Sequence, residues 1–196
     1  MFVQIIQGKI KDADLLTRQL ERWRQEIKPE ARGYLGSTGG ITADGTSIAM
    51  VRFDSEAAAR ANSERPEQGA WWNETEKAFD GPVTFTESSD TELLFDGGSN
   101  NAGFVQVMQG KVKDAAAFKK WQKDHEGQLK QIRPDLVGGI DAYQPDGSFT
   151  SVAYFTSEAE ARKNEKAMGE DPMMGEYMSH MDGEMQFLDI SKPDID

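Results

Sequence analysis

The chain contains nearly the same sequence twice, and the second copy follows the first at a constant offset of 102 residues. The segment FVQIIQGKIKDA at 2–13 returns as FVQVMQGKVKDA at 104–115, and FDSEAAARAN at 53–62 returns as FTSEAEARKN at 155–164. A copy of about 95 residues is the size of a small domain and is too long for a solenoid unit, which repeats every 20–50 residues or so. The sequence therefore predicts two copies of one domain, related within the chain like the subunits of a homodimer.

Composition narrows the choice of partners and compartment. The formal net charge is -12 and is divided evenly between the copies, which argues against nucleic acid and anionic membranes, because both require a basic face. The chain has no cysteine, which fits a reducing compartment. No signal-peptide pattern opens the sequence, and no apolar run approaches the 18 or so residues of a membrane span. We therefore expect a cytoplasmic protein that binds neither nucleic acid nor a membrane.

Within each copy the hydrophobic pattern predicts the order strand, helix, strand, strand, helix, strand. Asp12 is suited to cap the first helix, and a stripe of Leu16, Leu20, Trp23 and Ile27 recurs at helical spacing, so we expect one buried helical face. A single fourth strand is expected from Val83 to about Phe95. The expected boundaries are repeat 1 at 1–95, a Gly-rich linker at 96–103, repeat 2 at 104–191 and a tail at 192–196.

The order βαββαβ in a short segment is that of the ferredoxin-like unit, in which both helices cover one face of the sheet. The segment SIAMV at 47–51 is apolar on both sides, so the face without helices also needs a partner. We therefore expect an α+β fold in which two ferredoxin-like repeats pack sheet to sheet as an intramolecular dimeric α/β barrel. Further homo-oligomerisation stays open.

The sequence resembles a known family at several points. The βαββαβ order, the acidic, Ala-rich helix after FDSE, the stretch WWNETEKAF at 71–79 and the strand VTF after Asp-Gly-Pro are similar to the antibiotic biosynthesis monooxygenase branch of the dimeric α/β-barrel superfamily. The resemblance covers both copies. It implies a small-molecule ligand, since family members include cofactor-free oxygenases of aromatic polyketides, haem-degrading oxygenases and isomerases. Fold alone does not select among these activities.

Haem and metal chemistry fit the sequence poorly. The haem-degrading branch uses an amide on the first strand with a Trp and a His on the later helix, whereas Gln7 and Gln109 stand at the strand position here. The two Trp lie in copy one and the helix His in copy two, so the set is divided between the copies. Two His without Cys cannot make a three-His or thiolate site. We expect no metal and no cofactor.

The later helix carries the two candidate catalytic residues. Its stripe Trp71, Thr75, Ala78 in copy one becomes Met173, Tyr177, His180 in copy two. Histidine is the usual proton shuttle near neutral pH, and His180 follows Tyr177 by about one helical turn. We interpret Tyr177 and His180 as proton-transfer candidates; the alternative is a Tyr and a His at the rim of ordinary packing.

Six further residues are candidates for substrate binding. The resemblance implies that the later helix lines a cavity, which suggests Trp71, Trp72 and Met173, and that an Asn near the end of the preceding helix holds substrate, which suggests Asn62 and Asn164. Arg52, near the end of the third strand, could bind an anionic or phenolic group. The alternatives are a helix C-cap for the asparagines and a surface ion pair for the arginine.

The functional expectation is a cofactor-free monooxygenase that acts on a small aromatic substrate, with two non-equivalent pockets. In that chemistry the substrate supplies the electrons, and the protein deprotonates it, holds it and excludes water. The alternative is a non-catalytic small-molecule-binding or stress-related barrel.

Overall fold

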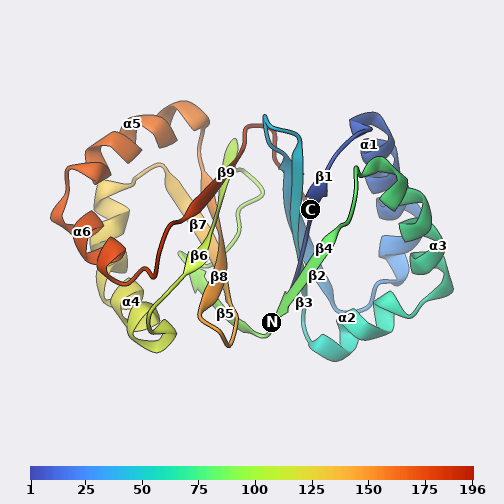
Figure 1. Cartoon of the computed structure of the whole chain (residues 1–196), viewed down its shortest axis with the longest axis horizontal. Helices are drawn as coiled ribbons and strands as arrows, with labels where there is room; N and C mark the ends of the chain where they lie inside the picture. Colours follow the sequence, from blue (N-terminus) through green and yellow to red (C-terminus); the bar gives the residue numbers. More distant parts are fainter. The chain divides into compact units, whose positions relative to one another are not determined.

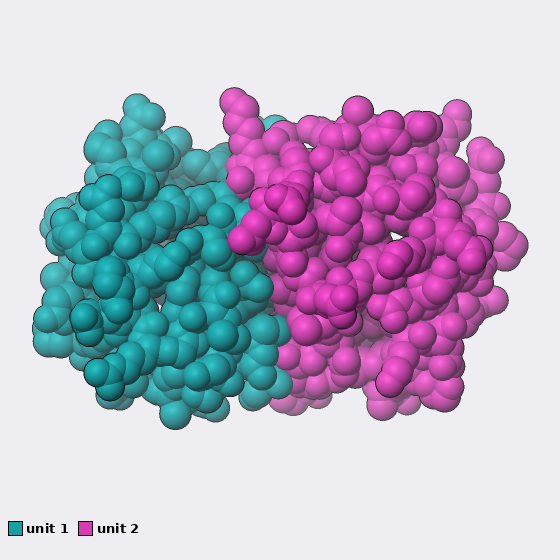
Figure 2. All heavy atoms as spheres, turned by 180° about the vertical axis from the view of Figure 1, so that it is seen from behind, with its two compact units in different colours: residues 1–89, 194–196 teal, residues 90–193 magenta.

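The computed structural model describes residues 1–196, which form two compact units (Figures 1 and 2). Unit 1 comprises Met1–Ser89 together with Asp194–Asp196, and unit 2 comprises Asp90–Pro193. Each unit contains one five-stranded antiparallel sheet with its helices on one face (Figure 1). None of the helices is both long and apolar enough to cross a membrane.

Unit 1 has the strand order β10-β2-β3-β1-β4. Its strands are β1 Phe2–Lys9, β2 Tyr34–Ile41, β3 Thr46–Phe53, β4 Thr84–Ser88 and β10 Asp194–Ile195. Its helices are α1 Ala13–Arg22, α2 Glu56–Ser63 and α3 Pro66–Thr75, with a π-helical segment Trp23–Ile27 and short 3₁₀ turns Lys28–Glu30 and Glu76–Ala78. The aromatic residues Phe2 and Phe53 are buried under the helices with Ala59 of α2.

Unit 2 repeats this arrangement with the strand order β5-β7-β8-β6-β9. Its strands are β5 Asp90–Leu94, β6 Phe104–Lys111, β7 Leu136–Tyr143, β8 Ser148–Phe155 and β9 Gln186–Ile190, and its helices are α4 Ala115–Ile132, α5 Glu158–Gly169 and α6 Pro172–Ser179. In both units the first and third strands of the repeat are central neighbours, which is the ferredoxin-like order. The structure thus confirms the expected α+β fold built from two ferredoxin-like repeats.

The edge strands differ from the sequence expectation. The segment expected as one strand from Val83 to about Phe95 divides at Ser89: β4 pairs with β1, whereas β5 pairs with β7 in unit 2. Residues 192–196, expected as a tail, include β10, which pairs with β2 in unit 1. The sheet of unit 1 is therefore extended by β10, which follows copy two, and the sheet of unit 2 by β5, which follows copy one. Each added strand covers backbone groups that the neighbouring strand would otherwise expose at the sheet edge.

The helix N-termini follow the capping residues. The carboxylates of Asp12 and Asp114 accept hydrogen bonds from the backbone N–H groups of Leu15 at 2.8 Å and Ala117 at 3.0 Å. Helix α3 begins at Pro66, because proline is suited to the first position of a helix, and Gly69 lies inside it.

The predicted apolar stripe of the first helix is only partly buried. Leu16 and Ile27 are buried, whereas Leu20 and Trp23 are half-buried. The indole N–H of Trp23 donates to the Gln68 side chain at 2.9 Å, so the ring lies where its polar edge has a partner. The stripe therefore supplies core contacts at its ends and a mixed surface in the middle.

Phe118 of α4 provides a test of the unit 2 core. It is 1% exposed, and its ring lies within 6.2 Å of four other aromatic rings. Phe118→Ala should lower the free energy of unfolding by about 3–5 kcal/mol, because a buried aromatic side chain leaves a cavity. Urea denaturation followed by circular dichroism measures the change. Phe187→Ala is the matched control, since Phe187 is 53% exposed; equal losses in both variants would contradict the assigned core.

Candidate functional site

The helix-facing surface of the unit 2 sheet carries a buried polar group at its centre. Asp141 of β7 lies opposite Ser151 of β8 on one side and opposite Glu92 of β5 on the other. Directly paired residues share a face of the sheet, and Asp141 faces the helices because Gln122 of α4 donates to its Oδ2 at 2.8 Å. The exposed fraction of Asp141 is 6%, so its carboxyl group is removed from bulk water.

Three side chains donate hydrogen bonds to Asp141. Besides Gln122, the hydroxyl group of Tyr143 lies 3.4 Å from the same Oδ2 and 2.9 Å from the Gln122 Oε1 atom, and Ser151 donates as well. Burial nevertheless raises the pKa of Asp141, and the charge of Glu92 adds to this increase, while the three hydrogen bonds act in the opposite direction. A buried carboxyl group with a raised pKa is typical of sites that handle protons.

Tyr177 and His180 lie in an aromatic cluster between α4 and α6. The Tyr177 ring is 5.4 Å from Phe118 and 5.9 Å from Trp121, and the His180 ring is 5.6 Å from each of the same two rings. Both residues are half-buried. The structure therefore brings together the two side chains that the sequence singled out for proton transfer.

The same electrostatic surroundings act on Tyr143 and Tyr177. Burial raises the pKa of Tyr177, and the charge of Asp141 raises it further, so this hydroxyl keeps its proton at neutral pH. Burial and Asp141 likewise raise the pKa of Tyr143. Tyr177 can therefore donate a hydrogen bond to a ligand oxygen. We call the residues Asp141, Gln122, Tyr143, Tyr177 and His180 the unit 2 cluster.

This cluster exists in one copy only. At the same offset, copy one has smaller or apolar residues, which are Gly39, Leu20, Ile41, Thr75 and Ala78, and Ala49 in place of Ser151. Sequence reasoning missed Asp141, Gln122 and Tyr143. A strand-by-strand comparison of the two copies could have identified Asp141, because its carboxyl group replaces Gly39 at a position that the strand register places under the helices.

His125, the second histidine, lies at the rim of the same helix pair. Its ring stacks on Trp121 at 4.7 Å, and its Nδ1 atom is 2.8 Å from the Trp121 backbone oxygen. Its Nε2 atom is 3.5 Å from Glu176, which also accepts a hydrogen bond from the Trp121 indole at 3.1 Å. These contacts orient Trp121 over the aromatic cluster. No group of three or more His, Asp or Glu side chains is arranged to hold a metal ion.

The two tryptophan candidates lie in unit 1, apart from the unit 2 cluster. Trp71 is buried, and its indole N–H donates to the backbone oxygen of Gln19 at 2.7 Å. Trp72 is half-buried, with its ring 6.0 Å from Trp71 and 5.1 Å from the exposed Phe85. The two tryptophans pack α3 against α1 and against the edge strand β4. This is a packing role that the structure shows directly.

The remaining candidates are dispersed. Asn62 is buried, accepts from the Arg65 guanidinium at 3.3 Å and lines an open pocket of about 380 Å³ in unit 1. Asn164 donates to the backbone oxygen of Glu160 at 3.0 Å, one turn earlier in α5. Arg52 donates to the backbone oxygen of Asp196 at 3.5 Å. Met173 is buried on α6, one turn before Tyr177.

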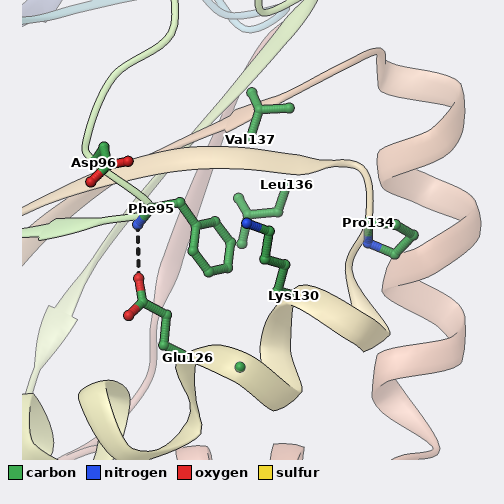
Figure 3. A pocket seen from close by; sticks show the side chains of 8 residues that line it. Phe95, Asp96, Glu126, Lys130, Pro134, Leu136 and Val137 are labelled. Carbon is green, nitrogen blue, oxygen red and sulfur yellow. Dashed lines mark hydrogen bonds between the residues drawn. The ribbon is translucent and has the colours of Figure 1, made fainter.

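A larger pocket of about 660 Å³ opens in unit 2 and contains none of the predicted residues (Figure 3). It lies beside the C-terminal half of α4 and the start of β7, where Glu126 accepts from the backbone N–H of Phe95 at 3.0 Å. The Lys130 Nζ atom lies 5.5 Å from the centre of the Phe95 ring. Lys130 and Glu126 thus already have partners within the pocket wall.

No protein-family model matches the chain, and no curated protein matches it either. Solved structures match it over nearly its whole length. A proposed monooxygenase from Lactobacillus acidophilus NCFM has a TM-score of 0.72 at 12% identity, with 96% of this chain and 91% of that chain covered. A proposed monooxygenase from Fusobacterium nucleatum subsp. nucleatum ATCC 25586 has a TM-score of 0.73 at 9% identity, with 96% and 90% covered.

An anthrone oxidase-like protein also matches, with a TM-score of 0.64, 7% identity and coverage of 99% of this chain and 92% of that chain. At such low identities the likeness concerns the fold. The chain therefore shares a two-repeat α+β fold with these solved structures, two of which are proposed monooxygenases.

Replacing Asp141 by Asn should change how stability depends on pH. The folded-state pKa of Asp141 is raised above the unfolded value of about 3.9, so between the two values the folded protein binds one more proton than the unfolded chain. This contribution to stability is complete below about pH 4 and is lost as the pH rises through the folded pKa. Because an Asn side chain does not ionise, we expect Asp141→Asn not to lose this stability. The variant should therefore become more stable relative to the parent as the pH rises.

Urea denaturation across this pH range measures the effect. Asp182→Asn is the control, because Asp182 is exposed in the same unit and its replacement should leave the parent profile unchanged. Superimposable profiles for the parent and Asp141→Asn would show that the carboxyl group is not buried in an ionisable state.

Proposed function

We propose that this protein is a cofactor-free monooxygenase that acts on a small aromatic substrate at the unit 2 cluster. One observation carries the proposal: in copy two a buried carboxyl group is hydrogen-bonded to Gln122 of α4 and to Tyr143, and Tyr177 and His180 pack against aromatic rings of the same helix. Copy one has small or apolar residues at the same places. Burying a carboxyl group costs stability, so such a group is usually retained for a task other than folding. The fold shared with proposed monooxygenases supports the reaction class.

The chemistry requires only an acidic substrate and molecular oxygen. A base removes a proton from a phenol or from a ring CH₂ group, and the resulting anion transfers electrons to O₂. Oxidation of CH₂ to C=O removes two hydrogens and four electrons; one oxygen atom enters the product, and the other leaves with the two hydrogens as water. The protein must therefore bind the ring, accept the proton and exclude bulk water from the anion.

The residues divide these tasks. His180 is the proposed base, and Tyr177, which keeps its proton, donates a hydrogen bond to the developing oxyanion. Trp121, which is half-buried, provides aromatic surface for the ring. Asp141 and Gln122 are positioning residues, because they hold Tyr143 and the sheet side of the cluster in place through hydrogen bonds.

The other residues that the sequence suggested for substrate binding are assigned as follows. Met173 belongs to the same site, since it lies one turn from Tyr177 on α6. Asn62 and Arg52 would belong to a separate, non-equivalent site in unit 1, where Trp71 and Trp72 pack α3 against its neighbours. We propose a cytoplasmic location on the cysteine-free composition alone.

Oxygen uptake tests the proposal directly. With 1,8-dihydroxyanthrone as the probe, the parent protein should consume one O₂ per molecule oxidised to the quinone. His180→Ala should lower kcat about 100-fold or more, which is the usual contribution of a positioned acid or base, while the free energy of unfolding changes by about 1 kcal/mol or less. Met178→Ala is the control, because Met178 is exposed on the same helix.

One outcome would overturn the enzymatic proposal, and a second would overturn the assignment of His180 as the base. In the first, the probe quenches the tryptophan fluorescence of the parent protein saturably, but no oxygen is consumed. The unit 2 cluster would then be a ligand-binding site without catalysis. If His180→Ala retains the parent rate, another group is the base.

A further inference from the structure

Unit 1 carries a second concentration of polar groups, around residues 194–196. These residues lie against β2, where the backbone N–H of Ser37 donates to the Asp196 oxygen at 2.9 Å and the Asp196 N–H donates back to Ser37 at 2.9 Å. The side chains of Asp194 and Asp196 point to the helix side, because Arg24 donates to Asp194 and Lys28 donates to Asp196. Two cations of the first helical region thus pair with two carboxylates of the segment that follows copy two.

Asp196 makes other polar contacts besides its ion pair with Lys28. The Tyr34 hydroxyl donates to Asp196 Oδ2 at 2.9 Å and lies 3.0 Å from Ser37 Oγ. Burial acts to raise the pKa of Asp196, yet the Lys28 ion pair and the Tyr34 hydrogen bond outweigh it, so the pKa is lowered and the carboxylate stays ionised. Arg52 donates to the Asp196 backbone oxygen, and the Arg52 Nε atom is buried without a partner.

Aromatic rings border this group of donors. The Tyr34 ring lies 4.9 Å from Trp23, and Trp23 lies 6.4 Å from Trp71. Trp23 opens the π-helical segment Trp23–Ile27, whereas the corresponding part of α4 is regular helix. Departures of this kind from α-helical geometry occur frequently at functional sites.

We propose that Arg24, Lys28, Tyr34 and Ser37 form a binding site for an aromatic carboxylate, and that Asp196 occupies the carboxylate position until the ligand displaces it. The Asp196 side chain shows what the donors can hold: one ionised carboxylate that accepts from an ammonium group and a phenol. The adjacent Trp23 and Tyr34 rings offer stacking surface to an aromatic ring attached to that carboxylate.

The segment that occupies the site forms only a short edge strand. Strand β10 spans only Asp194–Ile195, at the edge of its sheet, whereas the equivalent edge strand of unit 2 spans Asp90–Leu94. Short edge segments with few buried apolar contacts open at low free energy. Apart from the backbone pairing with β2, the Asp196 side chain contacts only the proposed donors Lys28 and Tyr34, so a competing carboxylate can take over these side-chain contacts.

Unit 2 lacks this site, which provides a control within the same molecule. At the same offset, unit 2 has Glu126 for Arg24, Leu136 for Tyr34, Gly139 for Ser37, Leu94 for Asp196 and Tyr154 for Arg52. Only Lys28 has a cationic counterpart, Lys130. The site is therefore specific to copy one, and its residues are distinct from those of the unit 2 cluster, so either proposal can fail without the other.

Calorimetric titration with 4-hydroxybenzoate tests the site. The double variant Asp194→Asn/Asp196→Asn should bind the probe with a Kd about 10-fold or more below that of the parent, because the competing charges are gone. Adding Lys28→Gln and Arg24→Gln to that variant should abolish the gain. Glu92→Gln, on the equivalent strand of unit 2, is the matched control and should leave the parent Kd unchanged.

Three results would overturn the proposal. The first is no binding of 4-hydroxybenzoate by the double variant at millimolar concentration, which would leave the ion pairs as strand contacts alone. The second is binding of inorganic phosphate as tight as that of the probe, which would remove the aromatic part of the assignment. The third comes from the parent protein, in which saturating probe should speed hydrogen exchange at the amides of Ser37 and Asp196; slower exchange there would show that residues 194–196 are not displaced.

Discussion

The packing of helices against one face of each sheet determines which side chains of a repeat can meet. Successive residues of a strand point to opposite faces, so every second residue of β7 and β8 lies on the face that the helices cover. Asp141 and Tyr143 are separated by one residue, and both therefore reach Gln122. Because Ser151 is paired directly with Asp141 across the ladder, it faces the same helix. The unit 2 cluster is thus a product of strand register and helix packing, and no contiguous motif encodes it.

The fold was readable from the sequence because the repeat gives the same pattern twice. The capping residues Asp12 and Asp114 stand at equivalent places, and each precedes a helix that begins at the next residue. The division of the fourth strand at Ser89 was not readable, since alternation predicts a strand without saying which neighbour it pairs with. Strand β10 was missed for another reason: two residues are too few for a periodicity signal, and its pairing depends on β2, more than 150 residues earlier.

The residues of the candidate site also differ in whether the sequence could identify them. Tyr177 and His180 could be identified because helical spacing is local and because their counterparts Thr75 and Ala78 differ in chemistry. Asp141 could not be identified by spacing, since its burial depends on two neighbouring strands and on α4. Trp71 resembles a pocket residue in the sequence, but its indole N–H is satisfied by the backbone of α1, a contact between segments that lie about 50 residues apart. Long-range hydrogen bonding therefore separates residues that pack from residues that remain available to a ligand.

The two units differ in where they place charge that is costly to bury. Unit 2 buries Asp141 against the sheet and offsets part of the penalty with three hydrogen bonds, although the pKa remains raised. Unit 1 has Gly39 at that place and gathers its ionised groups instead around residues 194–196, where Lys28 and Tyr34 lower the pKa of Asp196. A buried acid with a raised pKa can exchange a proton, whereas an ion-paired carboxylate with a lowered pKa marks a position that holds an anion. Duplication supplied one fold twice, and the substitutions at equivalent positions have given each copy a different kind of electrostatic environment.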